Sequence, residues 1–355
     1  GETLVAPSEM ALTLSTGEVL GESPRVRSAR RRAVTETIDA PLYRQSRFDA
    51  AYNELDLRLR GDYGILARAY DDGVCYRFYT ERDGELTIVD ETAQLNFEGD
   101  PSAYIPYSKT EIPMRTSFEN TYEYAPLSKF RTQTVAFMPV LVDLGERGYV
   151  LYTESDVEAY PGVYLTYDKE AKGFAARFAE YPTETSLTKR FQDVVERSAD
   201  YIARVDGRRS YPWRIVAYAA TANDMVWQTA EASRVADASW VRDGKIAWDW
   251  WNNWGVYGVD FKSGINTETY KYFIDFAAAN GIEYVALDEG WGVRDGDVMH
   301  VVPEIDLPEI VSYAREKKVG IILWVVAKVL DDKLEEACRY YSELGVAGWK
   351  VGFID

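Results

Sequence analysis

Acidic, amide, indole and lysine side chains recur at the ends of four apolar segments in the last third of the chain. They are Asp249, Trp251, Asn252, Asn253, Asp288, Glu289, Trp291, Lys328, Lys350 and Asp355. Carboxylates and amides can bond pairs of hydroxyl groups, and indole rings stack on the C–H faces of sugars. Phosphate recognition would favour arginine, lysine or a glycine-rich loop, in which this set is poor. Any one of these residues could instead cap a helix or form a loop ion pair, but the whole set favours a carbohydrate site.

Five of these residues are our candidates for contact with a substrate. They are Trp251, Asn252, Asp288, Glu289 and Lys350. Asp288 and Glu289 are adjacent at a strand end, so their side chains point to opposite sides and only one of them can face a site. We favour Asp288 or Trp251 for the substrate contact.

The elements that must position these residues alternate between strands and amphipathic helices. Strands are predicted over 245–254, 282–291, 319–327 and 348–355, and helices over 266–281, 306–318 and 331–345. Asn266 or Thr267 is expected to cap the first helix, and Pro308 lies in the first turn of the second. Repeated strand–helix units with polar strand ends predict the first half of a (β/α)₈ TIM-type barrel, ending at its fourth strand. A doubly wound open sheet is the alternative, although no G-x-G-x-x-G motif follows a strand here.

The preceding part of the chain reads as all-β. Short alternating runs such as "GILARAY", "GVCYRFYT" and "VYLTYD" are separated by turn residues from about residue 8 to 220, which predicts a β-sandwich. The segment "NDMVWQTAEAS" has a helical pattern and is expected to form a linker. The predicted fold class is therefore α/β plus all-β, with a sandwich and its helical linker over residues 1–235 and the half barrel over 236–355.

Composition narrows the classes of function. The net charge of −18 argues against nucleic acid and anionic membrane as partners. The sequence contains no apolar stretch of 18 residues, so no membrane span is predicted. The single histidine, His300, argues against a histidine-rich zinc site and a Ser-His-Asp triad. Cys75 and Cys338 fall in different predicted domains, so a disulfide framework is not expected, and the first residues carry no signal-peptide pattern. Chemistry is expected to depend on carboxylates.

Long stretches of the sequence resemble glycoside hydrolase family 97. The stretch from "GKIAWDWWNNWGVYGVDF" to "IEYVALDEGW" is similar to the entry into the catalytic barrel of that family, and "YGILARAYDDGVCYRFYT" and "SFENTYEY" resemble its N-terminal sandwich. The resemblance implies exo-acting hydrolysis of α-glycosidic bonds with bound Ca²⁺, for which Glu119 is the expected ligand. It also implies an oligosaccharide substrate and a periplasmic or secreted location.

The fourth strand bears on the stereochemistry that the resemblance implies. Retaining members resemble "KVDF" there, whereas this chain has "KVGF", with Gly352 in place of the nucleophilic aspartate. The sequence therefore predicts a calcium-dependent, inverting α-glucosidase acting on malto-oligosaccharide ends. The acid and base glutamates of the family lie beyond the fourth strand, so no catalytic residue is assigned within these residues and the missing barrel half is an expected partner. The alternatives are a retaining α-galactosidase and a noncatalytic carbohydrate-binding protein.

Overall fold

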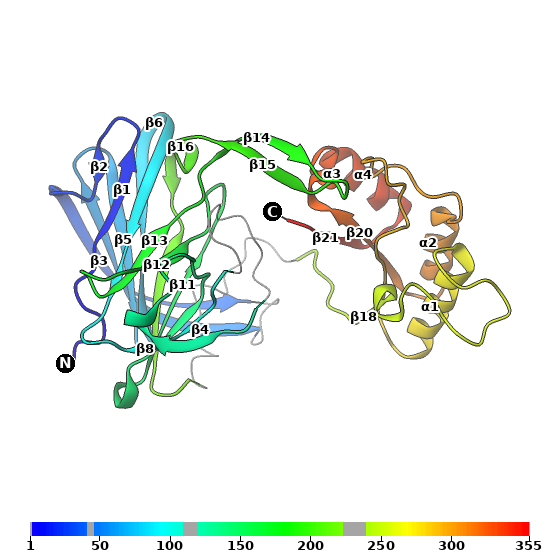
Figure 1. The fold of residues 1–355 in the computed structure, drawn as a ribbon, viewed down its shortest axis with the longest axis horizontal. Coiled ribbons are helices and arrows are strands. Elements are labelled where there is room, and N and C mark those ends of the chain that lie inside the picture. The colour runs from blue at the N-terminus through cyan, green and yellow to red at the C-terminus, as the bar shows by residue number, and fades with distance from the viewer. Residues whose placement is uncertain (1, 41–45, 109–119, 223–238, 355) are drawn as a thin grey trace. The chain divides into compact units, whose positions relative to one another are not determined.

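The computed structural model describes residues 2–40, 46–108, 120–222 and 239–354. It divides into two compact units, which are described separately: residues 1–183 with 197–239, and residues 184–196 with 240–355 (Figure 1). The boundary predicted between 235 and 236, and the helical linker predicted before it, fall within 223–238 and lie outside the described residues.

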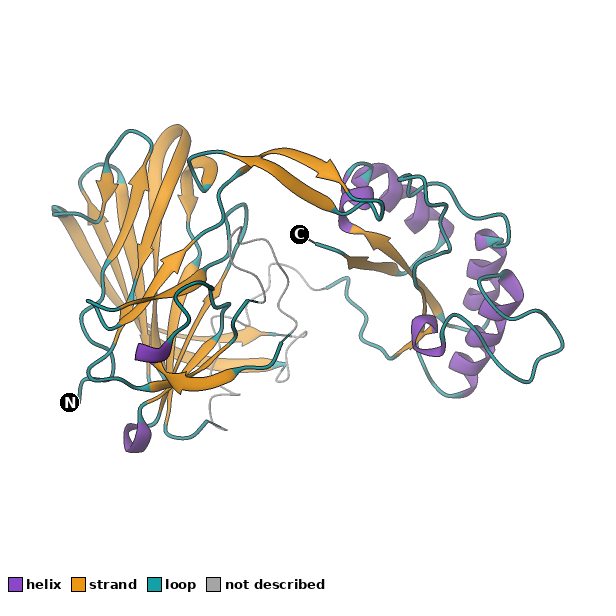
Figure 2. Cartoon of the chain, viewed as in Figure 1, coloured by secondary structure: helices purple, strands orange, loops and turns teal. Residues whose placement is uncertain are grey.

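The first unit is built almost entirely of strands (Figure 2). A 12-stranded sheet follows the order β3-β4-β5-β6-β17-β11-β10-β8-β9, with β1 and β16 pairing with β6, and β2 pairing with β1. The strands are β1 (Met10–Leu14), β2 (Val19–Leu20), β3 (Val26–Asp39), β4 (Arg47–Leu59), β5 (Tyr63–Tyr70), β6 (Gly73–Ala93), β8 (Ser102–Ile105), β9 (Glu123–Pro126), β10 (Val140–Asp143), β11 (Tyr149–Ser155), β16 (Ala203–Ser210) and β17 (Trp213–Ala219). A second sheet has the order β12 (Tyr164–Asp168), β13 (Gly173–Arg177), β7 (Leu95–Asn96). Two 3₁₀ turns lie at Leu127–Lys129 and Gly145–Arg147.

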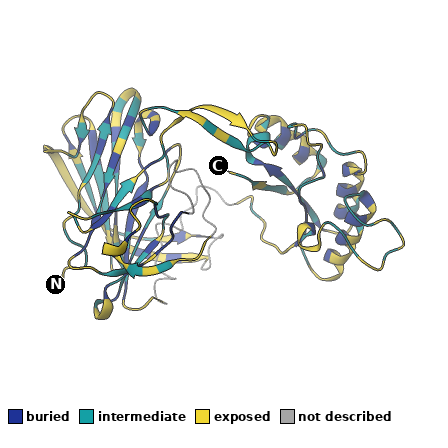
Figure 3. Cartoon of the chain, viewed as in Figure 1, coloured by how far each residue is buried: buried dark blue, intermediate teal, exposed yellow. Residues whose placement is uncertain are grey.

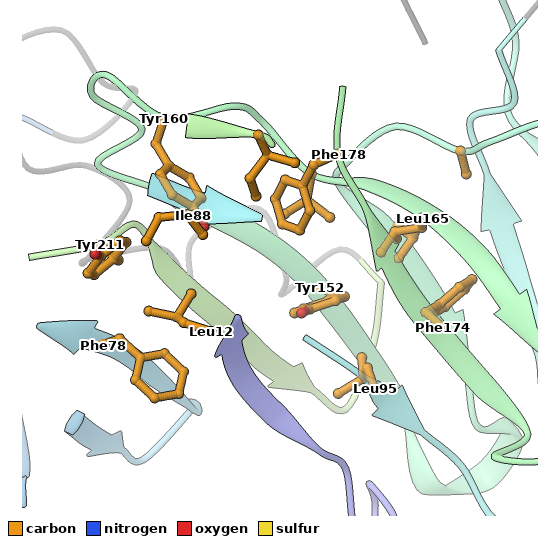
Figure 4. Close-up of a cluster of buried hydrophobic side chains, with 14 of the residues drawn as sticks. Leu12, Phe78, Ile88, Leu95, Tyr152, Tyr160, Leu165, Phe174, Phe178 and Tyr211 are labelled. Carbon is orange, nitrogen blue, oxygen red and sulfur yellow. The ribbon is translucent and has the colours of Figure 1, made fainter. Parts of the chain in front are cut away.

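The two sheets share one hydrophobic core. Leu12, Ile88 and Tyr152 from the large sheet belong to the same buried cluster as Leu165 and Phe174 from the small one (Figure 4). Along β4, buried and exposed residues alternate with a period of two, as expected for a strand with one face turned to a core. Figure 3 shows buried positions interspersed with exposed ones along the strands of this unit. The predicted β-rich architecture is confirmed.

A charged triad is buried within this unit. The guanidinium of Arg214, on β17, donates from Nε and Nη2 to the two oxygens of Glu91, both at 2.8 Å, and from Nη1 to Glu154 at 2.5 Å. Arg214 is 1% exposed and Glu91 is 4% exposed. Burial raises the pKa of Glu154 despite its contact with Arg214. The two carboxylates thus bind a guanidinium that is almost completely buried.

Strand β3 lies at one end of the large sheet. Among the described strands it pairs with β4 alone, and its residues 26–33 are all exposed. Four of these eight residues are arginines: Arg27, Arg30, Arg31 and Arg32.

The second unit contains a four-stranded parallel sheet in the order of the sequence, β18-β19-β20-β21. Its elements are β18 (Ile246–Trp248), the 3₁₀ helix η4 (Asp249–Asn252), α1 (Thr267–Ala279), β19 (Tyr284–Leu287), α2 (Leu307–Glu316), β20 (Gly320–Val326), α3 (Ala327–Asp331), α4 (Leu334–Leu344) and β21 (Gly348–Gly352). Helix α1 contacts β18 and β19, and α2 contacts β20. The tip of the hairpin formed by β14 (Pro182–Leu187) and β15 (Asp193–Ser198) also belongs to this unit. The predicted alternation of strands and helices is confirmed.

Local sequence signals explain where the helices begin. The side chain of Asn266 accepts a hydrogen bond from the backbone N–H of Thr269 at 3.0 Å, and Asp306 accepts one from Glu309 at 3.0 Å. Both are N-caps that satisfy a free donor of the first turn. Pro308 lies in the first turn of α2, where its missing N–H costs no helical hydrogen bond.

Three predicted strands are too long. The strand predicted over 348–355 ends at Gly352, and two others differ more from the structure. The strand predicted over 245–254 ends at Trp248, because Asp249 begins a 3₁₀ turn and Asn253 and Trp254 both adopt left-handed φ angles, 52° and 53°. The strand predicted over 282–291 covers only Tyr284–Leu287 and is followed by Gly290 with φ 118°. Tight turns at the strand ends, where functional side chains gather, account for both errors.

Within the described residues, no helix is both long and apolar enough to cross a bilayer. Cys75 and Cys338 are not joined by a disulfide in this structure.

Candidate active site

The parallel sheet has two chemically different faces. Odd-numbered strand residues such as Val285, Leu287 and Leu323 pack into the core shared with the helices. Successive side chains of a strand point to opposite faces, so the even-numbered residues form the other face. We call this the tryptophan face and define it by Trp248, Asp288, Trp324, Lys350 and Gly352.

Asp288, directly after β19, is the centre of the tryptophan face. Its Oδ2 accepts a hydrogen bond from Nε1 of Trp248 at 2.6 Å and another from Nζ of Lys350 at 3.0 Å. Its Oδ1 accepts the backbone N–H of Glu289 at 2.8 Å. The ammonium of Lys350 lies over the ring of Trp248, 4.6 Å from its centroid, and 5.9 Å from that of Trp324. The structure therefore brings two predicted site residues, Asp288 and Lys350, into direct contact.

Asp249 lies behind this group on the helix side of the sheet. It has no exposed surface, and its Oδ2 accepts a hydrogen bond from the hydroxyl of Tyr270 at 2.8 Å, while Oδ1 accepts the backbone N–H of Asp288 at 3.0 Å. Burial raises the pKa of Asp249 to about 6, an effect that these two donors oppose. Burial and the neighbouring Asp249 raise the pKa of Tyr270, so the hydroxyl stays protonated and donates.

The aromatic residues of the first strand end form a cluster beside Asp288. The rings of Trp248 and Trp250 are stacked with centroids 5.0 Å apart and an interplanar angle of 20°. Trp251 is 76% exposed, and its ring centroid lies 5.7 Å from that of Trp248. Asn252, also exposed, ends the same 3₁₀ turn. Exposed indoles beside hydrogen-bonding groups are suited to stacking on a pyranose ring.

Glu289 is held by two arginines. Nη2 of Arg190, at the tip of the β14–β15 hairpin, lies 2.8 Å from Oε2, and Nη2 of Arg294 lies 2.6 Å from Oε1. The same segments line a pocket that also includes Phe191, Trp291 and Trp324. Asp288 and Glu289 thus have separate partners, with Asp288 on the tryptophan face. The contribution of Arg190 escaped the sequence analysis because 99 positions separate it from Glu289.

Gly352 leaves little space for a side chain. A Cβ built on it would lie 2.6 Å from Nε1 of Trp324 and 3.1 Å from Cε2 of that ring. A carboxylate at this position would require the indole to move.

Glu119, the predicted metal ligand, lies outside the described residues. Across the ranges that the structure describes, no group of three or more His, Cys, Asp or Glu side chains has the arrangement of a metal site.

Comparison with known proteins identifies relatives for both units. The profile described as Glycosyl-hydrolase 97 N-terminal matches residues 1–231, and the profile described as Glycoside hydrolase 97 matches residues 250–355. A protein of Bacteroides thetaiotaomicron named "Retaining alpha-galactosidase" is 42% identical over 369 aligned positions, which cover 100% of this chain and 56% of that protein. A protein of Streptomyces bingchenggensis named "Probable retaining alpha-galactosidase" is 29% identical, with 100% of this chain and 53% of that protein covered. The chain thus spans about half the length of these relatives.

Solved structures share the fold. A glycoside hydrolase family 97 enzyme from Pseudoalteromonas sp. strain K8, in complex with acarbose, superposes with a TM-score of 0.79 at 19% identity, covering 99% of this chain and 55% of that one. A crystal structure of a β-arabinopyranosidase superposes with a TM-score of 0.77 at 21% identity, covering 99% and 57%.

Proposed function

The chain belongs to the glycoside hydrolase 97 family, and from this premise we propose that the full protein is a retaining α-galactosidase. The observation that carries the proposal is the 42% identity, across the whole of this chain, to a protein named "Retaining alpha-galactosidase". This proposal replaces the inverting α-glucosidase of the sequence analysis with its stated alternative.

The four parallel strands are proposed to be the first four strands of a (β/α)₈ barrel. Their sequential parallel order, with helices packed on one face, supports this arrangement. On this view the tryptophan face turns toward the barrel interior, and the carboxyl ends of the strands carry the site.

The tryptophan face offers groups for binding a sugar. Trp251 and Trp250 present indole surface, and Asp288 with Lys350 presents an acceptor and a donor side by side. A galactose ring differs from glucose in the orientation of one hydroxyl, and a fixed acceptor–donor pair can discriminate such a difference. We therefore propose Asp288 and Lys350 as contacts for hydroxyl groups and Trp251 as a stacking platform, with Asn252 and the arginine-bound Glu289 beside them.

A retaining mechanism needs a nucleophilic carboxylate, which Gly352 does not supply. Asp288 already accepts three hydrogen bonds, which leave one acceptor position on Oδ1 for a sugar hydroxyl group but make the carboxylate a poor nucleophile. We propose Asp355, the first carboxylate after Gly352 in the sequence, as the nucleophile; it lies outside the described residues. Its attack on the anomeric carbon would expel the aglycone oxygen, protonated by a general acid that we assign to no residue here, and water would then release the sugar with retained configuration.

Gly352 favours a second candidate, the inverting α-glucosidase. In that mechanism a base activates water, and the wider separation between the two carboxyl groups leaves room for it. A calcium requirement and a periplasmic or secreted location are proposed with either activity, and both rest on the family resemblance.

The test is hydrolysis of p-nitrophenyl α-galactoside and α-glucoside by the full protein, with the anomer first released followed by ¹H NMR. We expect cleavage of the galactoside with release of the α-anomer. The β-anomer from the glucoside would favour the inverting alternative, and binding without cleavage of either would favour a carbohydrate-binding protein. Parallel assays with EDTA and with Ca²⁺ added back test the metal. The Asp355→Ala variant should lose activity and regain part of it with azide, which can replace the missing nucleophile.

A further inference from the structure

Asp249 and Tyr270 form a buried pair for which a role on the tryptophan face is not obvious, because they lie on the other side of the sheet. Asp249 is fully buried and Tyr270 is 1% exposed. The donors to Asp249 are the Tyr270 hydroxyl and the backbone N–H groups of Asp288 and Trp250, and none of them carries a charge. A carboxylate buried among neutral donors is costly in free energy, so its presence calls for an explanation beyond packing.

The two oxygens of Asp249 connect helix α1 to the end of β19. Oδ2 faces Tyr270, the fourth residue of α1, and Oδ1 faces the backbone N–H of Asp288. The carboxylate therefore fixes the main chain at the point from which the Asp288 side chain leaves the sheet.

The neighbouring residue holds Asp288 from the opposite face. Trp248 immediately precedes Asp249, and its indole donates to Oδ2 of Asp288 at 2.6 Å. Consecutive residues of one strand end thus grip Asp288 twice: Trp248 holds its carboxylate, and Asp249 holds its backbone. Lys350, bound to the same carboxylate at 3.0 Å, completes the group.

We propose that Asp249 and Tyr270 are positioning residues, which fix the backbone of Asp288 so that its carboxylate stays aligned with Lys350 and Trp248 for binding sugar hydroxyls. The role in sugar binding rests on the proposed function. The alignment of Asp288 with Lys350 and Trp248 does not depend on that function. Neither residue touches the substrate in this proposal.

The first experiment compares Tyr270→Phe with Tyr341→Phe in the full protein. Tyr341 is a matched control, because it is also 1% exposed in the same unit and donates its hydroxyl to the carbonyl oxygen of Val298 at 2.7 Å. With an α-galactoside that the wild type cleaves, we expect Tyr270→Phe to lower kcat/KM about tenfold or more, as expected when a binding group is misplaced. Tyr341→Phe should change it less than about twofold. Equal losses in both variants would overturn the proposal.

The pH profile separates positioning from general damage. The Tyr270 hydroxyl lowers the pKa of Asp249, so its removal should raise that pKa above its value of about 6. The ionised form of Asp249 is the one that accepts both hydrogen bonds, so activity should fall as the pH drops through this pKa. The acidic limb should move to higher pH in Tyr270→Phe and stay in place in Tyr341→Phe. Other charged groups near Asp249 are Asp288 and its partner Lys350, which both variants retain.

A spectroscopic measurement keeps the inference independent of activity. In protein labelled with 5-fluorotryptophan, the ¹⁹F signal of Trp248 is identified by its loss in Trp248→Phe and followed against pH. We expect a transition near pH 6 in the wild type, at higher pH in Tyr270→Phe, and none in Asp249→Asn. A transition that persists in Asp249→Asn would belong to Asp288 and would contradict the proposal. If the signals behave as expected while no glycoside is cleaved, the proposed function fails and the positioning role stands.

Discussion

Gly352 shares the tryptophan face with a ring that fills the space above it. A methyl group on Gly352 would lie 2.6 Å from Trp324, whereas Gly348, on the same strand, has nothing within 4 Å of the corresponding position. We expect Gly352→Ala to lower the free energy of unfolding by about 1 to 3 kcal/mol, the usual range for overpacking. Gly348→Ala should change it by less than about 0.5 kcal/mol.

Urea unfolding of the two glycine variants, followed by tryptophan fluorescence, checks this prediction. Equal free energies of unfolding for Gly352→Ala and Gly348→Ala would mean that Trp324 moves without cost. In that case a carboxylate at position 352 would be sterically acceptable, and its absence would need a chemical reason.

Among individual residues, those at the ends of strands could be predicted from the sequence. Asp288 and Lys350 were predicted as site residues because the carboxyl ends of parallel strands meet at one edge, and the structure joins them at 3.0 Å. The burial of Asp249 could not be predicted, since it depends on Tyr270, which approaches from a helix. The hydrogen bond from Trp248 to Asp288 was also not predicted. A tryptophan in a strand is expected to lie in the core unless a partner for its indole N–H is known.

The strands β6, β11 and β17 each contribute one residue to the buried charged triad. Glu91 faces Arg214 with both oxygens, and Glu154 faces it from the neighbouring strand. We expect Glu91→Gln to lower the free energy of unfolding by about 1 to 3 kcal/mol, because it sets an amide N–H donor against a buried guanidinium donor, although Glu154 still balances the charge of Arg214. Thermal or urea unfolding measures the loss.

The control for this variant is an exposed pair of the same unit. Arg208 lies 2.5 Å from Asp83, with side chains 67% and 89% exposed. Asp83→Asn should cost less than about 1 kcal/mol, because solvent screens that pair. A cost for Glu91→Gln as small as this would mean that water reaches the triad.

Element boundaries followed from the sequence where the signals were local. Asn266 and Asp306 cap their helices through hydrogen bonds to residues only three positions away, so both caps could be predicted from the local sequence. The β14–β15 hairpin, in contrast, contributes Arg190 through a contact with Glu289 that no local pattern encodes.

At the scale of the whole molecule, the two units have separate hydrophobic cores with no residue in common. We therefore expect two heat-absorption transitions in scanning calorimetry of the 355-residue chain. Glu91→Gln should lower the temperature of one, and Gly352→Ala that of the other, because each variant acts within a single core. A single transition lowered by both variants would show that the units unfold together.

The broad division into a β-rich part and a strand–helix part was visible in the change of hydrophobic period. The roles of Glu119 and Asp355 stay predictions, because both residues lie outside those described.

Strand β3 is an edge strand among the described strands of the large sheet, and its arginines disfavour pairing with a second copy of the protein. Arg32 is bound to Glu54 at 2.6 Å, so the repulsion rests mainly on Arg30 and Arg31. Two copies meeting edge to edge along residues 26–33 would bring these guanidinium groups close together, which would oppose formation of an intermolecular ladder. Such repulsion acts over roughly 8 Å at physiological ionic strength and over about 3 Å in 1 M salt. The monodispersity of this protein should therefore depend on ionic strength, with concentrated salt favouring end-on growth of the sheet between molecules.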